Sequence, residues 1–195
     1  MTSTTCVWSI GHSNHDMPRF LELLRGVGVE VVADVRSQPY SRFSPQFNRR
    51  EFKEALAEAG FAYAFLGDEL GGRPPEPDLY DADGHVLYGE VAESERFRSG
   101  LDRLLSGAGR FHVAMLCSEE DPTNCHRRLL VTRVLAGQGI AVVHIRGDGS
   151  AETESELDAR LRQHSQSALF GEELSPWRST RSVSRSTALV TSSRH

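Results

Sequence analysis

The sequence contains no long hydrophobic run, and this absence excludes several classes of protein. Its N-terminus, MTSTTCVWSIGHS, has neither the basic segment of a signal peptide nor an apolar stretch that could span a membrane. The chain has only three cysteines, and an odd number does not suit a framework of disulfides. We therefore expect a cytoplasmic protein with reduced thiols and without a membrane partner.

A basic excess is absent as well. Lysine and arginine number 22 against 27 aspartates and glutamates, so the formal net charge is −5. This overall charge does not favour a nucleic acid as the partner, although a local basic patch is compatible with it. With 195 residues, of which 38% are hydrophobic, the chain is long enough for one domain with its own core.

Short apolar runs alternate with amphipathic segments along the chain. The runs are CVWSIG (6–11), EVVADV (30–35), FAYAFLG (61–67), FHVAMLC (111–117) and IAVVHI (140–145). The segments between them have helical spacing and begin at good N-cap residues: Asp16, Asn48 with Glu51, Ser94, Asp121 or Asn124, and Thr153 with Glu156. This alternation predicts an α/β fold, a single compact domain with a mostly parallel sheet of about five strands and helices on both faces.

Three segments interrupt this alternation. Residues 36–47 contain two prolines and no regular period, which predicts a long loop. Residues 68–91 are rich in Gly, Pro and Asp, and we expect an irregular insertion or lid within a domain that spans residues 1–174. Residues 175–195 are rich in Ser, Thr and Arg and contain no acidic residue, so we predict a disordered tail there.

Polar residues gather where the predicted strands end, and in a parallel sheet ligands bind beyond these carboxyl ends. The opposite edge has only short turns such as GVGVE and GAGRF. We therefore expect a pocket at the carboxyl edge that binds a small anionic or nucleotide-like substrate. Its candidate residues are His12, Ser13, Asp34, Arg36, Tyr40, Arg42, Gln46, Gly71, Gly72, Arg73, Cys117, Glu119, His126 and Arg127.

Cys117 is the leading candidate for a catalytic residue. Its thiolate is favoured if it faces the N-terminus of the next helix and lies near Arg36 or Arg127. The alternative is that Cys117 is a small hydrophobic residue at the end of a core strand. The Cys-x5-Arg loop of cysteine phosphatases is absent, because Thr123 stands where its arginine belongs.

Zinc is the second interpretation of the same stretch, with Cys117, Cys125 and His126 as candidate ligands. Structural zinc sites usually take paired ligands two to four residues apart, whereas seven residues separate the two cysteines here. Cys125 and His126 are neighbours, and on a helix their side chains point about 100° apart. We therefore predict no cofactor and keep zinc as the alternative.

The other candidates have two interpretations each. Asp34 and Arg36 face the same side of a strand, so they either form a structural ion pair or both serve the pocket, Asp34 as a base toward water and Arg36 as an anion ligand. His12 is either a loop partner or a general acid–base, and we favour the latter, with Glu119 as a second proton carrier. Several arginines beside one pocket indicate a phosphate or carboxylate group.

At these residues the sequence resembles a known family. The stretches SIGHSNH, ADVRSQPYSRFSPQF, LGDELGGRP and LCSEEDPTNCHRRLL are similar to the motifs of the DUF488 family, in the same order, over about Ile10 to Ile145. The matching positions are Gly11, His12, Ser13, Asp34, Arg36, Arg42, Pro45, Gly71, Gly72, Cys117, Glu119, Cys125, His126 and Arg127. The resemblance implies a compact α/β domain and supports the site at the strand ends, but it implies no substrate or reaction.

Three functions are compatible with these residues. The first is a hydrolase or transferase in which Cys117 or Asp34 is the reactive group and His12 and Glu119 transfer protons. The second is a nucleic-acid base-processing enzyme such as a DNA glycosylase, in which Tyr40, Phe43 and Phe47 stack on a base, Arg42, Arg49 and Arg50 contact phosphates, and Asp34 activates water. The third is a non-enzymatic ligand- or zinc-binding module. The sequence makes no prediction of oligomeric state.

Overall fold

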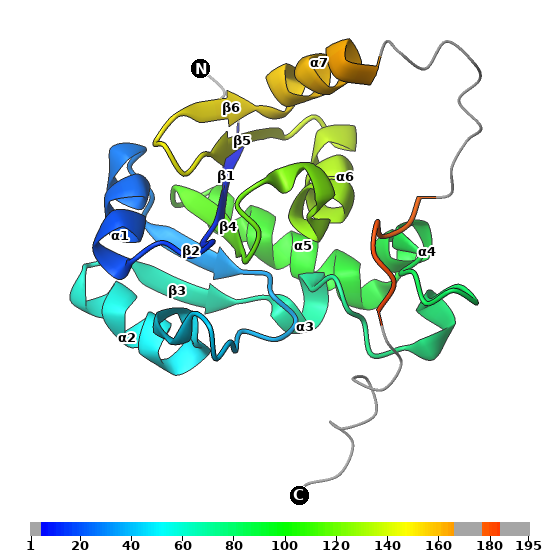
Figure 1. Ribbon diagram of the computed structural model, residues 1–195, viewed down its shortest axis with the longest axis horizontal. Helices are drawn as coiled ribbons and strands as arrows, with labels where there is room; N and C mark the ends of the chain where they lie inside the picture. Colours follow the sequence, from blue (N-terminus) through cyan, green and yellow to red (C-terminus); the bar gives the residue numbers. More distant parts are fainter. Residues whose placement is uncertain (1–4, 166–176, 184–195) are drawn as a thin grey trace, which may run out of the picture.

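The computed structural model describes residues 5–165 and 177–183. Its centre is a six-stranded sheet with the strand order β3-β2-β4-β1-β5-β6 (Figure 1). The strands are β1 (Cys6–Gly11), β2 (Val31–Asp34), β3 (Ala62–Phe65), β4 (Val113–Cys117), β5 (Ala141–Ile145) and β6 (Ala151–Thr153). Neighbouring strands are parallel except for β5 and β6. The predicted α/β fold with a mostly parallel sheet is confirmed, and the short β6 is the strand that the sequence did not indicate.

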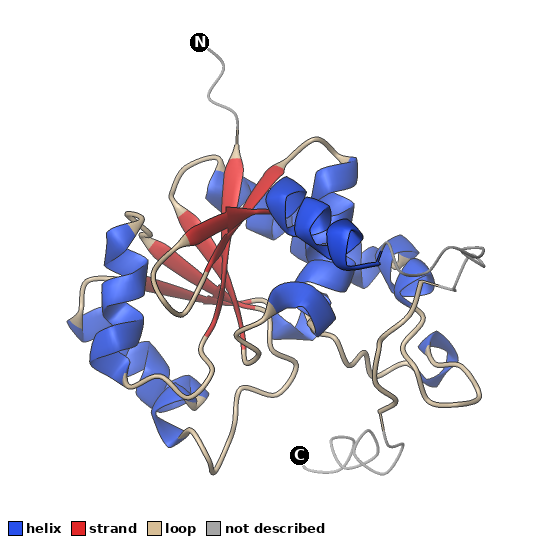
Figure 2. Ribbon diagram, turned by 45° about the horizontal axis from the view of Figure 1, so that its top comes forward, coloured by secondary structure: helices blue, strands red, loops and turns tan. Residues whose placement is uncertain are grey.

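Helices cover both faces of the sheet (Figure 2). They are α1 (Met17–Gly26), α2 (Arg49–Glu58), α3 (Gly67–Leu70), α4 (Tyr88–Glu93), α5 (Glu95–Ala108), α6 (Arg133–Gly137) and α7 (Glu154–Ser165). Short 3₁₀ turns, η1 (Pro45–Phe47), η2 (Pro77–Leu79) and η3 (Pro122–Asn124), and a π-helical segment, η4 (Arg127–Thr132), complete the set. In the part of the chain that the structure describes, no helix is long and apolar enough to cross a membrane.

An aromatic cluster fills the space between the sheet and helices α1 and α2. The rings of Phe20, Phe47 and Phe52 lie 5.1–5.5 Å apart, centroid to centroid, and all three are buried. Ile10 of β1 and Leu116 of β4 reach the same cluster from the sheet. Such offset and edge-on ring contacts stabilise a core beyond the area they bury.

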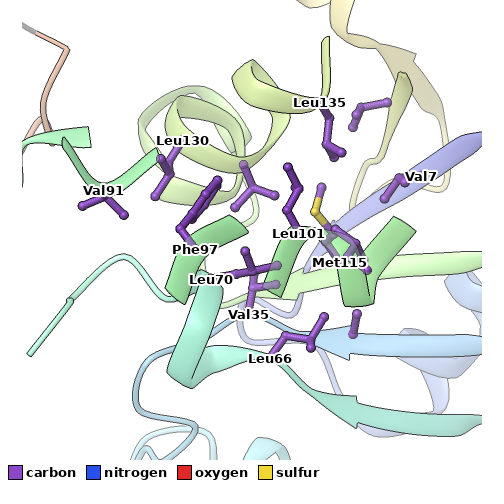
Figure 3. Packing of buried hydrophobic residues seen from close by; sticks show 14 of the residues in the cluster. Val7, Val35, Leu66, Leu70, Val91, Phe97, Leu101, Met115, Leu130 and Leu135 are labelled. Atoms are coloured by element: carbon purple, nitrogen blue, oxygen red, sulfur yellow. The ribbon is translucent and has the colours of Figure 1, made fainter. Parts of the chain in front are cut away.

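The second core lies between the sheet and helices α3, α5, η4 and α6 (Figure 3). Met115 of β4 packs there with Phe97 and Leu101 of α5 and with Leu130 of η4. Because side chains alternate along a strand, Cys117 faces the same side as Met115, whereas Leu116 faces the aromatic cluster. The fold therefore directs Cys117 toward η4.

The predicted helix starts are only partly correct. Asp16 accepts a hydrogen bond from the backbone N–H of Arg19 at 2.8 Å, and Ser94 accepts one from that of Phe97 at 3.2 Å. Thr153 and Glu156 form the expected capping box, with bonds of 2.8 and 3.2 Å. The capping box at Asn48 is wrong, because its side-chain oxygen accepts instead from the backbone N–H of Ser41, which holds the 36–47 loop.

The region 68–91, predicted as an irregular insertion or lid, contains α3, η2 and the start of α4, and it packs beside α5 (Figure 1). The prediction of a disordered tail is wrong for residues 177–183, which run along this region. The Trp177 indole N–H donates to Leu129 O at 2.6 Å, and Val86 and Ser179 exchange two hydrogen bonds of 2.9 and 3.0 Å. The other residues of the predicted tail lie outside the described residues.

Candidate functional site

The carboxyl ends of β1 and β4 meet side by side. Gly11 pairs with Cys117, and the backbone continues this pairing beyond the strands, with His12 N–H donating to Cys117 O at 3.0 Å and Ser13 N–H to Ser118 O at 2.8 Å. Asp34 lies at the end of β2, opposite Leu116 of β4. The sequence motifs at these three strand ends are therefore brought to one edge of the sheet, as the parallel topology predicts.

A cavity of about 460 Å³ opens at this edge. Its wall includes Cys117, Cys125 and His126, together with Arg36 after β2 and Tyr88 of α4. The segment 179–183 closes one side of it. Two larger hollows, of about 870 and 770 Å³, lie on the outer face of α5 and beside β6. Neither contains a thiol or a histidine, so the smaller cavity is the candidate site.

Two cysteines and one histidine form a compact cluster in this cavity. The Sγ atoms of Cys117 and Cys125 lie 3.6 and 3.9 Å from Nδ1 of His126, and the three atoms are all within 4.8 Å of one another. The other ring nitrogen, Nε2, lies 2.9 Å from Val35 O. A carbonyl oxygen only accepts, so Nε2 carries a proton and donates it, and Nδ1 is directed to the sulfurs.

The charges around Cys117 favour its thiolate. A hydrogen bond from the Cys125 thiol lowers the pKa of Cys117 most, burial opposes this, and the nearby His126 and Arg127 lower it further, so the net result lies well below the ordinary value. Bonding to the Cys117 sulfur raises the pKa of Cys125, and burial adds to this. Burial is the largest effect on the pKa of His126 and lowers it, but the charge and hydrogen bond of Cys117 and the bond to Val35 O together outweigh burial, so the pKa lies above its ordinary value. The favoured state is therefore a Cys117 thiolate beside a Cys125 thiol.

Arg127 is a buried cation beneath the loop that follows Cys117. Its side chain is fully buried, and it donates to Ser9 Oγ at 2.9 Å, to Glu119 O, and to Glu120 O at 2.6 Å. Among the described residues, no carboxylate forms an ion pair with it. The π-helical segment begins at Arg127, and π turns inside helices are frequent at functional sites. Arg127 therefore holds the 118–120 loop and leaves a positive charge near Cys117.

Two motif glycines permit this packing. A Cβ atom on Gly11 would collide with the carbonyl oxygen of Glu119, so glycine lets the loop cross over β1. A Cβ atom on Gly72 would lie 2.6 Å from Cγ and 2.7 Å from Cβ of His126. The Gly-Gly motif thus belongs to the same site as the Cys…Cys-His-Arg motif, because it leaves room for the imidazole ring.

Asp34 and Arg36 form the structural ion pair that was one of the two interpretations. Arg36 Nε and Nη2 donate to the two oxygens of Asp34 at 2.9 and 2.7 Å, and the Tyr63 hydroxyl donates to Oδ2 at 2.8 Å. Asp34 is 0% exposed and is not part of the cavity wall, so no water in the cavity reaches it. Arg36, in contrast, lines the cavity.

His12 also lies outside the cavity wall. Its ring stacks on Phe47 with centroids 4.3 Å apart, and its Nδ1 lies 2.8 Å from Ser13 O. Burial, with the charge of Arg36 as the second cause, lowers the pKa of His12 to about 4. A neutral, stacked imidazole suits a structural role, and the expectation that His12, Asp34 and Cys117 share one crevice is wrong for the first two side chains.

The remaining predicted residues separate into two groups. Tyr40, Gly72, Arg73 and Glu119 line the cavity. Ser13, Arg42, Gln46, Gly71 and Arg127 do not, and Gln46 is used instead to donate to His15 O at 3.0 Å. The sequence did not indicate Tyr88 or the segment 179–183, because they come from the region expected to be irregular and from the predicted tail. No period or motif marks either of them.

The Cys117–Cys125–His126 cluster offers three donor atoms that could hold a metal ion. The objection that Cys125 and His126 diverge is wrong, because Cys125 precedes the helix with an extended backbone (φ −101°, ψ 141°). Its sulfur therefore turns toward Cys117 and lies within 4.8 Å of the Cys117 sulfur. The edges of a tetrahedral zinc site with two sulfurs and a nitrogen measure about 3.6–3.8 Å, which this cluster approaches.

Comparison with known proteins leads to one family. Neither a curated protein nor a solved structure matches the chain. Residues 16–134 match the family described as "Domain of unknown function DUF488". This range contains the motifs around Asp34, Gly72 and Cys117, and it begins just after the Gly-His-Ser motif. Because the match covers more than half of the chain, the protein belongs to the DUF488 family.

Proposed function

We propose that the protein is a small cytoplasmic enzyme, a hydrolase or transferase, in which the Cys117 thiolate attacks an anionic or nucleotide-like substrate. One observation carries this proposal. Arg127 is a fully buried guanidinium that has no carboxylate partner among the described residues, and a buried charge without a counter-ion is costly. A thiolate on Cys117 supplies the missing negative charge, in a cavity where a substrate can reach it.

The cluster supports a two-step reaction. The Cys117 sulfur forms a bond to the electrophilic atom of the substrate, and the leaving group departs with the proton that His126 holds on Nδ1. His126 then accepts a proton from water or from an acceptor hydroxyl, whose oxygen attacks the same atom. This second attack breaks the bond to sulfur and restores the thiolate. The 3.6 Å separation of Cys117 Sγ and His126 Nδ1 places the proton carrier directly beside the attacking sulfur, and such contacts tighten when substrate binds.

Arginines at the cavity favour a substrate with a negative charge. Arg36 uses Nε and Nη2 on Asp34, which leaves Nη1 for an anionic group in the cavity. Arg73 and Arg181 are exposed at the same opening. In this proposal Asp34 fixes Arg36 rather than acting as a base, and Glu119, which lines the cavity, carries protons.

The experiment compares thiol reactivity and activity across single cysteine variants. At pH 7, Cys117 reacts with iodoacetamide roughly tenfold faster than a free small thiol, and peptide mass spectrometry locates the label. Cys117→Ser removes this fast phase and the hydrolysis of a carboxylate-bearing nitrophenyl ester, whereas Cys6→Ser, at the other end of β1, retains both. A Cys117 that reacts no faster than the free thiol removes the nucleophile from the proposal.

A nucleic-acid substrate is the second candidate, and the loop after β2 favours it. Tyr40 and Phe43 are 76% and 87% exposed, and the Arg42 guanidinium lies 5.5 Å from the Phe43 ring centre. Exposed aromatic rings with arginines are typical of surfaces that stack unpaired bases. Phe47, expected to join them, is buried instead.

Binding to a labelled single-stranded oligonucleotide at low salt tests this candidate. A Tyr40→Ala/Phe43→Ala variant weakens binding roughly tenfold or more if the rings stack on bases, while Phe111→Ala, at the opposite edge of the sheet, has no effect. Absence of binding by the wild-type protein at low salt eliminates the candidate.

A zinc-binding module is the third candidate, and the three donors of the cluster favour it. Zinc with two thiolates and a neutral imidazole has no net charge and would leave Arg127 unbalanced, which is why we prefer the metal-free thiolate. One zinc per purified chain, with a lower melting temperature after chelation, reverses this preference.

A further inference from the structure

Cys125 takes part in no bond-forming step of the proposed reaction, although its thiol lies beside the reacting sulfur and helps to hold its charge. It stands immediately before His126 and the helical segment η4, at a place where a side chain can cap a helix. Serine and threonine serve better in such a capping position than a weakly accepting thiol. Cys125 is also buried, so a position on the surface does not explain the presence of a thiol there. A second thiol at this place indicates sulfur chemistry rather than capping.

We propose that Cys117 and Cys125 form a dithiol–disulfide couple that exchanges with disulfides carrying an anionic group. The proposal rests on Cys117 as the nucleophile and adds Cys125 as the thiol that completes the exchange. Its basis is the cluster geometry, with both sulfurs and His126 Nδ1 within 4.8 Å of one another and all three cysteines of the chain free. A disulfide needs the two sulfurs about 2.05 Å apart, so the side chains of Cys117 and Cys125 must move toward each other before the bond forms.

The exchange proceeds in two displacements. The Cys117 thiolate attacks one sulfur of the external disulfide, forming a mixed disulfide and expelling the other half as a thiolate, and the proton that His126 held on Nδ1 passes to this thiolate or to water, which leaves Nδ1 free to accept a proton. His126 Nδ1 then takes the proton of the Cys125 thiol, and the Cys125 sulfur attacks that of Cys117. The bond between Cys117 and the substrate breaks, and the departing thiolate takes the proton from His126. Two electrons pass from the pair to the external disulfide, and an external dithiol reverses the process.

Loss of the negative charge on Cys117 assists the second displacement. The thiolate of Cys117 is what holds the Cys125 proton most strongly in the resting state. When Cys117 is part of a mixed disulfide, that charge is gone and the Cys125 proton is released more readily. The hydrogen bond from Nε2 to Val35 O keeps Nδ1 directed to the sulfurs through both steps.

The arginines at the opening determine the substrate class. Arg73 and Arg181 are exposed at the cavity, and Glu119 is the acidic residue of its wall. Disulfides with carboxylates therefore approach more easily than neutral ones. The third cysteine, Cys6, pairs with Ala141 at the amino end of β1, at the edge opposite to Cys117. Burial raises the pKa of Cys6, so it serves as a slow internal reference.

The test uses the full-length protein and dithiobis(nitrobenzoate), an aryl disulfide with two carboxylates. In the wild-type protein two thionitrobenzoate groups are released per Cys117–Cys125 pair, none is retained, and peptide mapping finds these cysteines joined with the loss of two hydrogens. Cys125→Ser releases one group at a similar rate and retains the other on Cys117. Cys117→Ser slows the fast phase by roughly tenfold or more. Serine still caps the helix, so the Cys125 variant folds.

The charge preference has its own control. The double variant Arg73→Gln/Arg181→Gln reacts roughly tenfold more slowly with dithiobis(nitrobenzoate) and at the wild-type rate with neutral dithiodipyridine. Arg110→Gln, before the amino end of β4, leaves both rates unchanged.

Three results overturn the couple, and they differ in whether the proposed nucleophile survives. A wild-type mixed disulfide that persists on Cys117 removes Cys125 from the chemistry but leaves the proposed nucleophile in place. A disulfide that includes Cys6 does the same. Slow reaction of Cys117 with both iodoacetamide and the disulfide removes the couple and the proposed function together. If Arg73→Gln/Arg181→Gln and the wild type react with dithiobis(nitrobenzoate) at equal rates, only the preference for anionic substrates is refuted.

Discussion

Gly72→Ala tests whether His126 controls the reactivity of Cys117. Gly72 does not have a left-handed backbone, so alanine is excluded only by contact. Its Cβ atom would lie 2.6 Å from Cγ of His126, whereas carbon atoms in contact lie about 3.5–4.0 Å apart. The ring must therefore shift by about 1 Å. This shift disturbs both the 2.9 Å bond to Val35 O and the 3.6 Å approach to Cys117.

The expected cost follows from these contacts. Overpacking costs about 1–3 kcal/mol, and a weakened hydrogen bond adds about 1 kcal/mol. The reduced entropy of the unfolded chain recovers about 0.4–1 kcal/mol. We therefore expect the free energy of unfolding to fall by about 2 kcal/mol in a urea titration followed by circular dichroism. The reaction of Cys117 with iodoacetamide at pH 7 slows roughly tenfold, because the displaced imidazole no longer stabilises the thiolate.

Gly137→Ala is the matched control. No atom lies within 4 Å of a Cβ atom built on Gly137, which ends α6 away from the cavity. We expect this variant to have wild-type reactivity and equal or slightly greater stability. If Gly72→Ala is as stable as the wild type and Cys117 keeps its reactivity, then the imidazole does not hold the thiolate, and the reasoning about the cluster fails.

Three further predictions concern residues around the cavity. The pKa of His12 is lowered from 6.5 to about 4, so the unfolded state binds more protons in this range and the free energy of unfolding falls as the pH decreases. Between pH 7 and pH 5, the free energy of unfolding measured in urea titrations falls by about 2 kcal/mol more in the wild type than in His12→Gln. Parallel pH curves for the two proteins contradict this prediction. Arg127→Met leaves two loop carbonyls without their donor and lowers the free energy of unfolding by about 2–5 kcal/mol in thermal unfolding. The control Arg110→Met, at an exposed residue, changes it by less than about 0.5 kcal/mol. Similar losses in the two variants refute the role of Arg127 in holding the loop. Trp177→Ala releases the 177–183 segment, so trypsin cleaves after Arg178 roughly tenfold faster than in the wild type, and unchanged cleavage shows that Trp177 does not anchor it.

Local patterns in the sequence predicted the elements because these patterns report burial directly. Runs such as EVVADV and FHVAMLC are apolar on both faces, as a central parallel strand requires, and the amphipathic segments cover them. The short β6 has no such pattern, because a three-residue strand at an edge buries too little to mark the sequence. Asn48 satisfied the pattern of a cap, but the loop backbone at Ser41 competed successfully for its side-chain oxygen.

The candidate site was predicted as an edge of the sheet rather than as an arrangement of side chains. The rule for parallel strands located Cys117, Arg36 and Gly72 correctly at one opening. It did not distinguish the two faces of the sheet, so it also included His12 and Asp34. Their side chains serve the aromatic face and an ion pair with Arg36 instead.

The sequence alone determined the alternation of strands and helices, the edge at which polar residues gather, and membership of a family by its motifs, because each depends on residues near one another in the chain. Tertiary structure decided which of those residues meet. It turned Cys125 and His126 toward Cys117, buried Arg127 with no carboxylate partner among the described residues, and brought residues 179–183 from beyond α7 to the cavity wall. These outcomes depend on side-chain direction and on contacts between distant segments, and a linear pattern contains neither.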